Sequence, residues 1–236
     1  MIAIINGKAC TFESGERIIT VAARNDIEIP TLCHHEGLCG LGTCRVCVVE
    51  MNGRIVPACI TKLEKPCEIS TDNARVREER GMMLALLRKR APNSEAVAQM
   101  AERYQAPELP RLTIAEEADR CIMCGLCVQA CKALGNSAIA TVMRGTKKKI
   151  ATPYDEATNA CVGCGSCAKV CPTGSIAIKE EHGIRTIWQR NFRLVYCKTC
   201  HALLGTEEML KKNAVQEALC PDCKGYATAK LVREKL

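Results

Sequence analysis

Two copies of one cysteine spacing constrain this chain more than any other feature. The segments CIMCGLCVQAC, from residue 121, and CVGCGSCAKVCP, from residue 161, both follow the pattern C-x2-C-x2-C-x3-C. In such a run the first three thiolates hold one iron–sulfur cube, and the fourth holds the cube of the other run. The spacing therefore predicts two [4Fe–4S] clusters with interleaved ligands. The ligands would be Cys121, Cys124, Cys127 and Cys171 for the first cluster, and Cys131, Cys161, Cys164 and Cys167 for the second.

The duplicated run resembles the bacterial two-cluster ferredoxins, and the resemblance implies a ferredoxin fold for residues 111–182. Small residues stand between the cysteines, among them Gly125, Gly163 and Gly165. They allow backbone N–H groups to approach the sulfides of a cluster. A disulfide framework and zinc sites are the alternatives, and the matched two-fold repeat disfavours both.

Cysteine content also fits the size of the domains. The chain has 236 residues, of which 19 are Cys and only 3% are aromatic. Three domains of roughly 70 residues each cannot build large cores, so they need metal sites or other cross-links. C-x2-C pairs in a chain without a secretion signal indicate metal binding in a reducing compartment. We therefore expect a cytoplasmic protein without a membrane span, because no stretch approaches ~20 apolar residues.

The formal net charge of +7 at pH 7 raises the question of nucleic-acid binding. Four tetrathiolate sites at roughly −2 each would contribute about −8, which leaves the loaded protein near neutrality. We therefore expect the excess of lysine and arginine to balance the clusters, and no nucleic-acid partner. A structural or sensory cluster protein that binds nucleic acid is the weakest functional hypothesis.

Residues 1–76 predict a β-grasp domain. Strands are expected at 2–5, 9–12, 45–51 and 54–60, with Asn-Gly turns after residues 5 and 51 and a helix at 17–26. Cys44, Cys47 and Cys59 suit a [2Fe–2S] cluster under a glycine-rich loop. The fourth ligand is either Cys33 or Cys39, and Cys39 gives the C-x4-C-x2-C spacing of plant ferredoxins.

The phrases IPTLCHHEGL, GTCRVCVVE and ACIT resemble the N-terminal region of the large iron–sulfur subunit of complex I. They also resemble the matching domains of [FeFe]-hydrogenases and NAD-linked formate dehydrogenases. The first ligand in that family lies ten residues before the C-x2-C pair. The resemblance thus implies the [2Fe–2S] ligands Cys33, Cys44, Cys47 and Cys59, with Cys39 as an extra thiol near the cluster. The family's His-and-three-Cys motif is missing, since no Cys or His lies between residues 67 and 121.

Residues 77–110 are expected to form a helical linker. An apolar stripe predicts a helix at 74–90, and Asn93 or Ser94 would cap a second helix that reaches about Tyr104. These helices are either a packing strut between domains or a docking surface for a partner. The basic run RGTKKK at 144–149 is either a solvated loop or a docking site for an acidic electron carrier.

Residues 183–236 contain a fourth set of cysteines. Cys197, Cys200, Cys220 and Cys223 follow the pattern C-x2-C-x19-C-x2-C, which places four sulfurs around one ion. Strands are expected at 184–188 and 192–196, with a helix at 206–213. Zinc ribbons and rubredoxins share such paired cysteines, and the segment resembles the tail of a small ferredoxin-like subunit of formate hydrogenlyase-type complexes. We expect one mononuclear Zn or Fe, with a third [4Fe–4S] cluster as the less favoured alternative.

No motif for a substrate, flavin or nucleotide accompanies these sites, and we predict no catalytic residue. The expected function is that of an electron-transfer subunit in a hetero-oligomeric complex. It would pass single electrons between a flavin- or NAD(P)H-linked partner and another redox subunit or ferredoxin. Complexes of the hydrogenase, formate dehydrogenase or electron-bifurcating transhydrogenase type fit this description. A free-standing soluble multi-cluster ferredoxin is the alternative.

Overall fold

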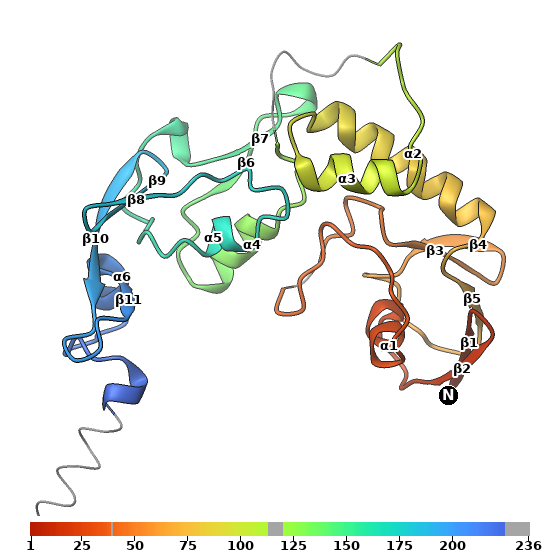
Figure 1. Cartoon of the computed structure of the whole chain (residues 1–236), viewed down its shortest axis with the longest axis horizontal. Helices are drawn as coiled ribbons and strands as arrows, with labels where there is room; N and C mark the ends of the chain where they lie inside the picture. Colours follow the sequence, from red (N-terminus) through yellow and green to blue (C-terminus); the bar gives the residue numbers. More distant parts are fainter. Residues whose placement is uncertain (39, 113–119, 225–236) are drawn as a thin grey trace, which may run out of the picture.

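The computed structural model describes residues 1–38, 40–112 and 120–224, and it confirms an α+β fold made of small units. Figure 1 shows the N-terminal sheet at one end of an arched molecule and two packed helices at the top of the arch. The cysteine repeat and the C-terminal strands form the other end. No helix in the described ranges is both long enough and apolar enough to cross a membrane.

The N-terminal unit is a five-stranded sheet in the order β2-β1-β5-β3-β4, in which only β1 and β5 pair in parallel. Its elements are β1 (Ile2–Ile5), β2 (Lys8–Thr11), α1 (Ile18–Arg24), β3 (Val48–Met51), β4 (Arg54–Pro57) and β5 (Glu68–Ser70). Helix α1 packs on the sheet through Ile18 and Val21, which share a core with Ile5 and Val49. This arrangement is the predicted β-grasp.

Both predicted Asn-Gly turns are present, and their four residues all have positive φ values. The second hairpin is shorter than predicted, since β3 begins at Val48 and not at Arg45. Arg45 has a φ of 57°, which no strand residue adopts, because the chain is still curling through the cysteine loop at that point.

The helical linker consists of α2 (Ala74–Arg90) and α3 (Glu95–Arg103), which agree with the predicted helices. Each begins with a side-chain cap: Asn73 accepts a hydrogen bond from the Val76 N–H, and Ser94 accepts one from the Val97 N–H. The two helices pack closely. A Cβ at Gly81 would lie 3.3 Å from the Tyr104 carbonyl oxygen, so a larger residue would push the two segments slightly apart.

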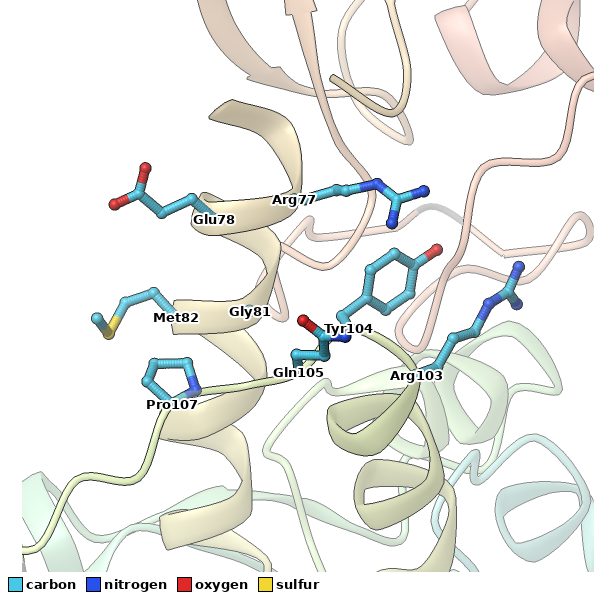
Figure 2. Close-up of a pocket in the computed structure, with 8 residues that line it drawn as sticks. All are labelled: Arg77, Glu78, Gly81, Met82, Arg103, Tyr104, Gln105 and Pro107. Atoms are coloured by element: carbon cyan, nitrogen blue, oxygen red, sulfur yellow. The ribbon is translucent and has the colours of Figure 1, made fainter. Parts of the chain in front are cut away.

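A cavity of about 470 Å³ lies between α2 and the end of α3 (Figure 2). Figure 2 shows the Tyr104 ring beside α2, with the side chains of Arg77 and Arg103 on either side of it. Arg77 pairs with Asp72, and Arg103 pairs with Glu28 across to the N-terminal unit. Both pairs are solvent-exposed and contribute little to stability.

The cysteine repeat contains α4 (Leu126–Ala133), α5 (Ser166–Lys169) and a hairpin of β6 (Ala140–Val142) and β7 (Lys149–Ala151). Helices α4 and α5 pack beside each other. Short 3₁₀ turns cover 145–147 and 153–155.

The C-terminal sheet has the strand order β11-β10-β9-β8. Its elements are β8 (Lys179–Glu181), β9 (Ile184–Ile187), β10 (Arg190–Tyr196), β11 (Leu203–Thr206) and the following α6 (Glu207–Lys212), which Thr206 caps. Because β8 pairs with β9, the sheet runs across the boundary that the sequence suggested between residues 182 and 183. The last strands are therefore structurally continuous with the repeat.

Candidate iron–sulfur and metal centres

The cysteine loop of the N-terminal unit brings four buried thiols together. Cys33, Cys44 and Cys47 come from the segment between α1 and β3, and Cys59 follows β4. None of the four is more than 3% exposed. The Cys44 N–H donates to the Cys33 Sγ at 3.5 Å, which is the amide-to-sulfur contact expected around a cluster. Cys39, the alternative ligand, lies outside the described residues.

Hydrogen bonds among these sulfurs separate their pKa values. Bonds from the Cys44 and Cys59 thiols lower the pKa of Cys33 to about 2, and a bond from Cys59 lowers the pKa of Cys47 to about 7. The same bonds raise the pKa values of Cys44 and Cys59. The Cys33 thiol interacts with those of Cys44 and Cys59, and the Cys59 thiol with that of Cys47, so the four sulfurs form one connected group. Such a group suits the four-thiolate donor set of a [2Fe–2S] cluster. We propose these four residues as its ligands.

The repeat contains two cysteine-lined cavities. The first has a volume of about 150 Å³, and the second closes to about 20 Å³. The cysteines that line the first are Cys121, Cys124, Cys127 and Cys171, and those that line the second are Cys131, Cys161, Cys164 and Cys167. Each cavity thus takes three cysteines from one run and the last cysteine of the other. We propose these two sets as the ligands of the first and second cubane.

The two runs also repeat each other in backbone geometry. Gly125 and Gly165 precede α4 and α5 with φ values of 77° and 78°, a left-handed conformation that glycine adopts without strain. The last cysteine of each run, which serves the cluster of the other run, also accepts a backbone hydrogen bond in both copies. The Ala138 N–H donates to the Cys131 Sγ at 3.2 Å, and the Ser175 N–H donates to the Cys171 Sγ at 3.3 Å.

Burial dominates the electrostatics of the first cubane site. It raises the pKa of Cys124 to about 11 and that of Cys127 to about 12. A buried thiolate needs a positive charge nearby to offset its desolvation, and iron supplies one. Iron binding at this site must therefore displace the protons of these thiols.

The [2Fe–2S] site and the first cubane site share one hydrophobic core. Cys33 and Cys44 pack in the same buried cluster as Ile122, Cys124 and Leu126, and α2 and α3 add Leu84, Val97 and Ala101. A Cβ at Gly125 would lie 3.2 Å from the Leu41 Cδ1, so the two cysteine loops are in contact. The two sites are therefore joined by dry, packed side chains.

The C-terminal cysteines form a separate, compact group. The sulfurs of Cys197, Cys200, Cys220 and Cys223 all lie within 4.8 Å of one another. Backbone N–H bonds from Cys200 and Cys220 lower the pKa of Cys197 to about 6, so one ligand is readily available as thiolate. Four sulfurs at this separation suit a single tetrahedral ion, and the site can hold a further metal.

Two family models match the chain: a 2Fe-2S iron-sulfur cluster binding domain at residues 3–74, and a 4Fe-4S dicluster domain at residues 114–178. The chain is an iron–sulfur protein with both domains. The predicted cofactors, a [2Fe–2S] cluster and a pair of [4Fe–4S] clusters, are thereby confirmed.

Relatives of this iron–sulfur protein belong to redox enzymes. It is 31% identical over 217 residues to the HndD subunit of the NADP-reducing hydrogenase of Solidesulfovibrio fructosivorans, covering 78% of this chain and 36% of the relative. It is 31% identical over 199 residues to a subunit of the NADH-quinone oxidoreductase of Rhizobium meliloti, covering 73% and 23%. The chain thus spans about a third or less of these two relatives.

A relative of similar length is the gamma subunit of the NAD-reducing hydrogenase HoxS of Cupriavidus necator. It is 28% identical over 222 residues, which cover 80% of this chain and 92% of the relative. In a crystal structure of an NAD⁺-reducing [NiFe]-hydrogenase, one chain has the same fold, with a TM-score of 0.64 and 23% identity. The match covers 74% of this chain and 85% of that one. The predicted resemblance to this group of proteins is confirmed.

Sequence reasoning missed several charged and aromatic residues around these sites. Arg80 of α2 is fully buried and donates to the carbonyl oxygens of Val46, Val48 and Thr71 at 2.8 to 3.0 Å. It also stacks on the Tyr104 ring at 4.7 Å. Its burial could have been predicted from the helical spacing. Arg80 lies four residues from both Val76 and Leu84, on the buried face of the helix.

Two arginines from the C-terminal sheet, outside the cysteine repeat, also contact the second cubane site. The Arg185 Nη1 donates to the Gly163 carbonyl at 2.8 Å. The Arg190 Nη1 donates to the Thr158 and Cys161 carbonyls at 2.9 and 3.0 Å. These contacts come from β9 and β10, which no cysteine spacing marks.

Proposed function

We propose that this chain is the electron-transfer subunit of a multi-subunit oxidoreductase. Its clusters, when bound, take up and release single electrons. The chain would connect a flavin- or NAD(P)H-linked partner with another redox subunit or with ferredoxin. The observation that carries the proposal is the row of three cysteine sites in one molecule, in which a common core joins the first two and the paired α4 and α5 join the last two.

The order of the sites along the molecule supports electron transfer through the chain rather than storage of electrons in it. Proposed [2Fe–2S] ligands from the N-terminal loop share a core with Cys124 of the first cubane set. Three proposed ligands of the second cubane share a core with Ile187 and Phe192 of the C-terminal sheet. Partners could therefore exchange electrons at opposite ends. Thiol ligands stay reduced in the cytoplasm, which is the location that we propose.

The relatives support the type of assembly. Two of them are named as subunits of NADP- and NAD-reducing hydrogenases, and one as a subunit of an NADH-quinone oxidoreductase. We propose a hetero-oligomer of this kind for the present chain, in which another subunit binds the flavin or the nicotinamide cofactor.

We propose that the C-terminal site holds one Zn or Fe in a structural role. It lies at the end of the molecule, beyond the strands that border the second cubane site (Figure 1). A metal there would order the segment around β11 and α6, because a four-thiolate site stabilises small folds directly.

Anaerobic purification from the native host with metal and sulfide analysis tests this proposal. We expect co-purification with a flavoprotein or nicotinamide-binding subunit, and about 10 iron atoms per chain if the tail holds zinc. About 11 would mean a mononuclear iron, and about 14 a third cubane. A stable, fully loaded monomer without partners would contradict the electron-transfer subunit and favour a free-standing ferredoxin.

A further inference from the structure

The turn between β9 and β10 places the only tryptophan of the chain between the two cubane cavities. Trp188 lines the first cavity together with Cys121 and Cys171, and it lines the second together with Cys161 and Cys167. Its indole Nε1 donates to the Cys167 Sγ at 3.5 Å. One side chain thus borders both sites and bonds to a proposed ligand of only one of them.

The backbone at this turn is unfavourable for the residues that occupy it. Trp188 and Gln189 have φ values of 51° and 59°, the left-handed region of a two-residue hairpin turn. Asn and Gly are the residues that normally fill such a turn, and a bulky side chain there is strained. Strained residues persist only when their surroundings hold them, and they concentrate at functional sites.

Trp188 is partly buried and packs against the core that contains proposed ligands of the second cubane. Ile187 and Phe192 on either side of the turn are buried in the same core as Cys127, Cys131 and Cys167. A Cβ at Gly163 would lie 2.5 Å from the Phe192 ring, so the hairpin is pressed against the second cysteine run. The hairpin therefore aims the indole at a fixed point between the sites.

We propose that Trp188 sets the difference in reduction potential between the two cubanes. A hydrogen bond to a ligand sulfur favours the more negative, reduced state of the cluster, and exclusion of water acts on both clusters alike. The indole ring shields both sites, while its N–H raises the potential of the second cubane alone. Electrons would then favour the cubane nearer to the C-terminal sheet. The indole itself neither gains nor loses an electron.

This inference rests on the proposed cubane ligands, and a conservative variant tests it. Trp188→Phe keeps an aromatic ring and removes the N–H. In the anaerobic holoprotein, we expect the one-electron equilibrium between the cubanes to shift about tenfold, as a fall of about 59 mV in the midpoint of the second cubane. The midpoint of the first cubane should stay unchanged. Redox titration followed by EPR measures both, and the signal altered in Cys164→Ser identifies the second cubane.

A neighbouring substitution supplies the control. Gln189→Gly relieves strain at the same turn and leaves the indole in place, so both midpoints should stay at their original values. Equal midpoints in Trp188→Phe and the unsubstituted protein, with both cubanes present by iron count and EPR, would overturn the role of Trp188 alone. Absence of cubanes from the unsubstituted protein would instead overturn the proposed function.

If Trp188→Phe loses the second cubane, the unsubstituted holoprotein still gives a test. Backbone N–H groups also donate to ligand sulfurs of both cubanes, but the chain has a single tryptophan, so a ¹⁵N label in the indole marks Trp188 alone. The labelled nitrogen should produce a hyperfine coupling to the reduced second cubane. An equivalent coupling to the first cubane, or none to the second, would contradict the proposal.

Discussion

At the scale of single residues, the chain combines many replaceable surface groups with a few buried ones that hold the sites in shape. Arg80 and Gly42 are two of these. Arg80 fills the space between α2 and β3 with a cation whose bonds are almost all to backbone oxygens. Gly42 lets the cysteine loop turn where a side chain would collide with a neighbour of Cys59.

Replacing Arg80 with Leu should destabilise the protein strongly. The change leaves the carbonyls of Val46, Val48 and Thr71 buried without their donor, at a cost of about 3 kcal/mol. For a chain of this length, the thermal midpoint should fall by roughly 6–12 °C. Arg77→Leu on the same helix removes an exposed pair with Asp72 and should change stability by about 0.5 kcal/mol or less. Calorimetry of both holoproteins gives the comparison, and equal midpoints would refute this role for Arg80.

Replacing Gly42 with Ala should impair the [2Fe–2S] site. Its φ is 65°, and an added Cβ would lie 2.7 Å from the Ile60 Cδ1, next to Cys59. We expect up to about two iron atoms per chain to be lost, with the cubane signals retained. Gly53→Ala is a matched control, because Gly53 also has a positive φ but its Cβ would meet no atom within 4 Å. Similar iron loss in both variants would attribute the effect to backbone strain alone.

At the scale of elements, the β9–β10 hairpin belongs functionally to the cysteine repeat, although it follows the repeat in sequence. It supplies Arg185 and Arg190, which bind carbonyls of the second cysteine run, and Phe192, which packs on Gly163. The hydroxyl of Thr206, at the end of β11, donates to the Val162 carbonyl of the same run. The second cubane site is therefore enclosed from the C-terminal side.

Removing residues 183–236 should make the second cubane labile. The truncated chain lacks every one of these contacts, so we expect iron to fall by about four atoms beyond the loss of any tail metal. Cys223→Ser is the control, since it disturbs the tail site and leaves β9 and β10 in place. Iron analysis and EPR report the result. Retention of both cubanes after truncation would show that the repeat closes the site unaided.

At the scale of the whole molecule, the basic run 144–149 lies next to the first cubane site. Lys149 lines that cavity, and Arg90 at the end of α2 binds the carbonyls of Thr146 and Lys148 at 3.4 and 2.9 Å. The linker thus anchors the loop, whose lysines remain exposed. We propose that an acidic electron carrier docks at this loop beside the first cubane site.

Reversing the charge at Lys147 and Lys148 should slow electron exchange with an acidic ferredoxin. Exposed charges mainly steer association, so we expect the second-order rate to fall by about tenfold at low ionic strength and the difference to shrink as salt is added. Stopped-flow kinetics measures both effects. Lys8→Glu, on the N-terminal sheet, should leave the rate nearly unchanged. A deficit that does not depend on salt would argue against steering at this loop.

Local patterns in the sequence determined much of this protein. Cysteine spacing predicted the cluster types, and Asn-Gly pairs predicted both hairpin turns. An apolar stripe predicted helix α2, which begins at an asparagine cap. These features depend on residues close together in the chain, and short-range geometry governs them. Only the tertiary structure showed that Arg80 is buried, that Trp188 lies between two cavities, and that one core joins the first two sites. Such contacts join segments separated by tens of residues, and they exist only once the units have packed against one another.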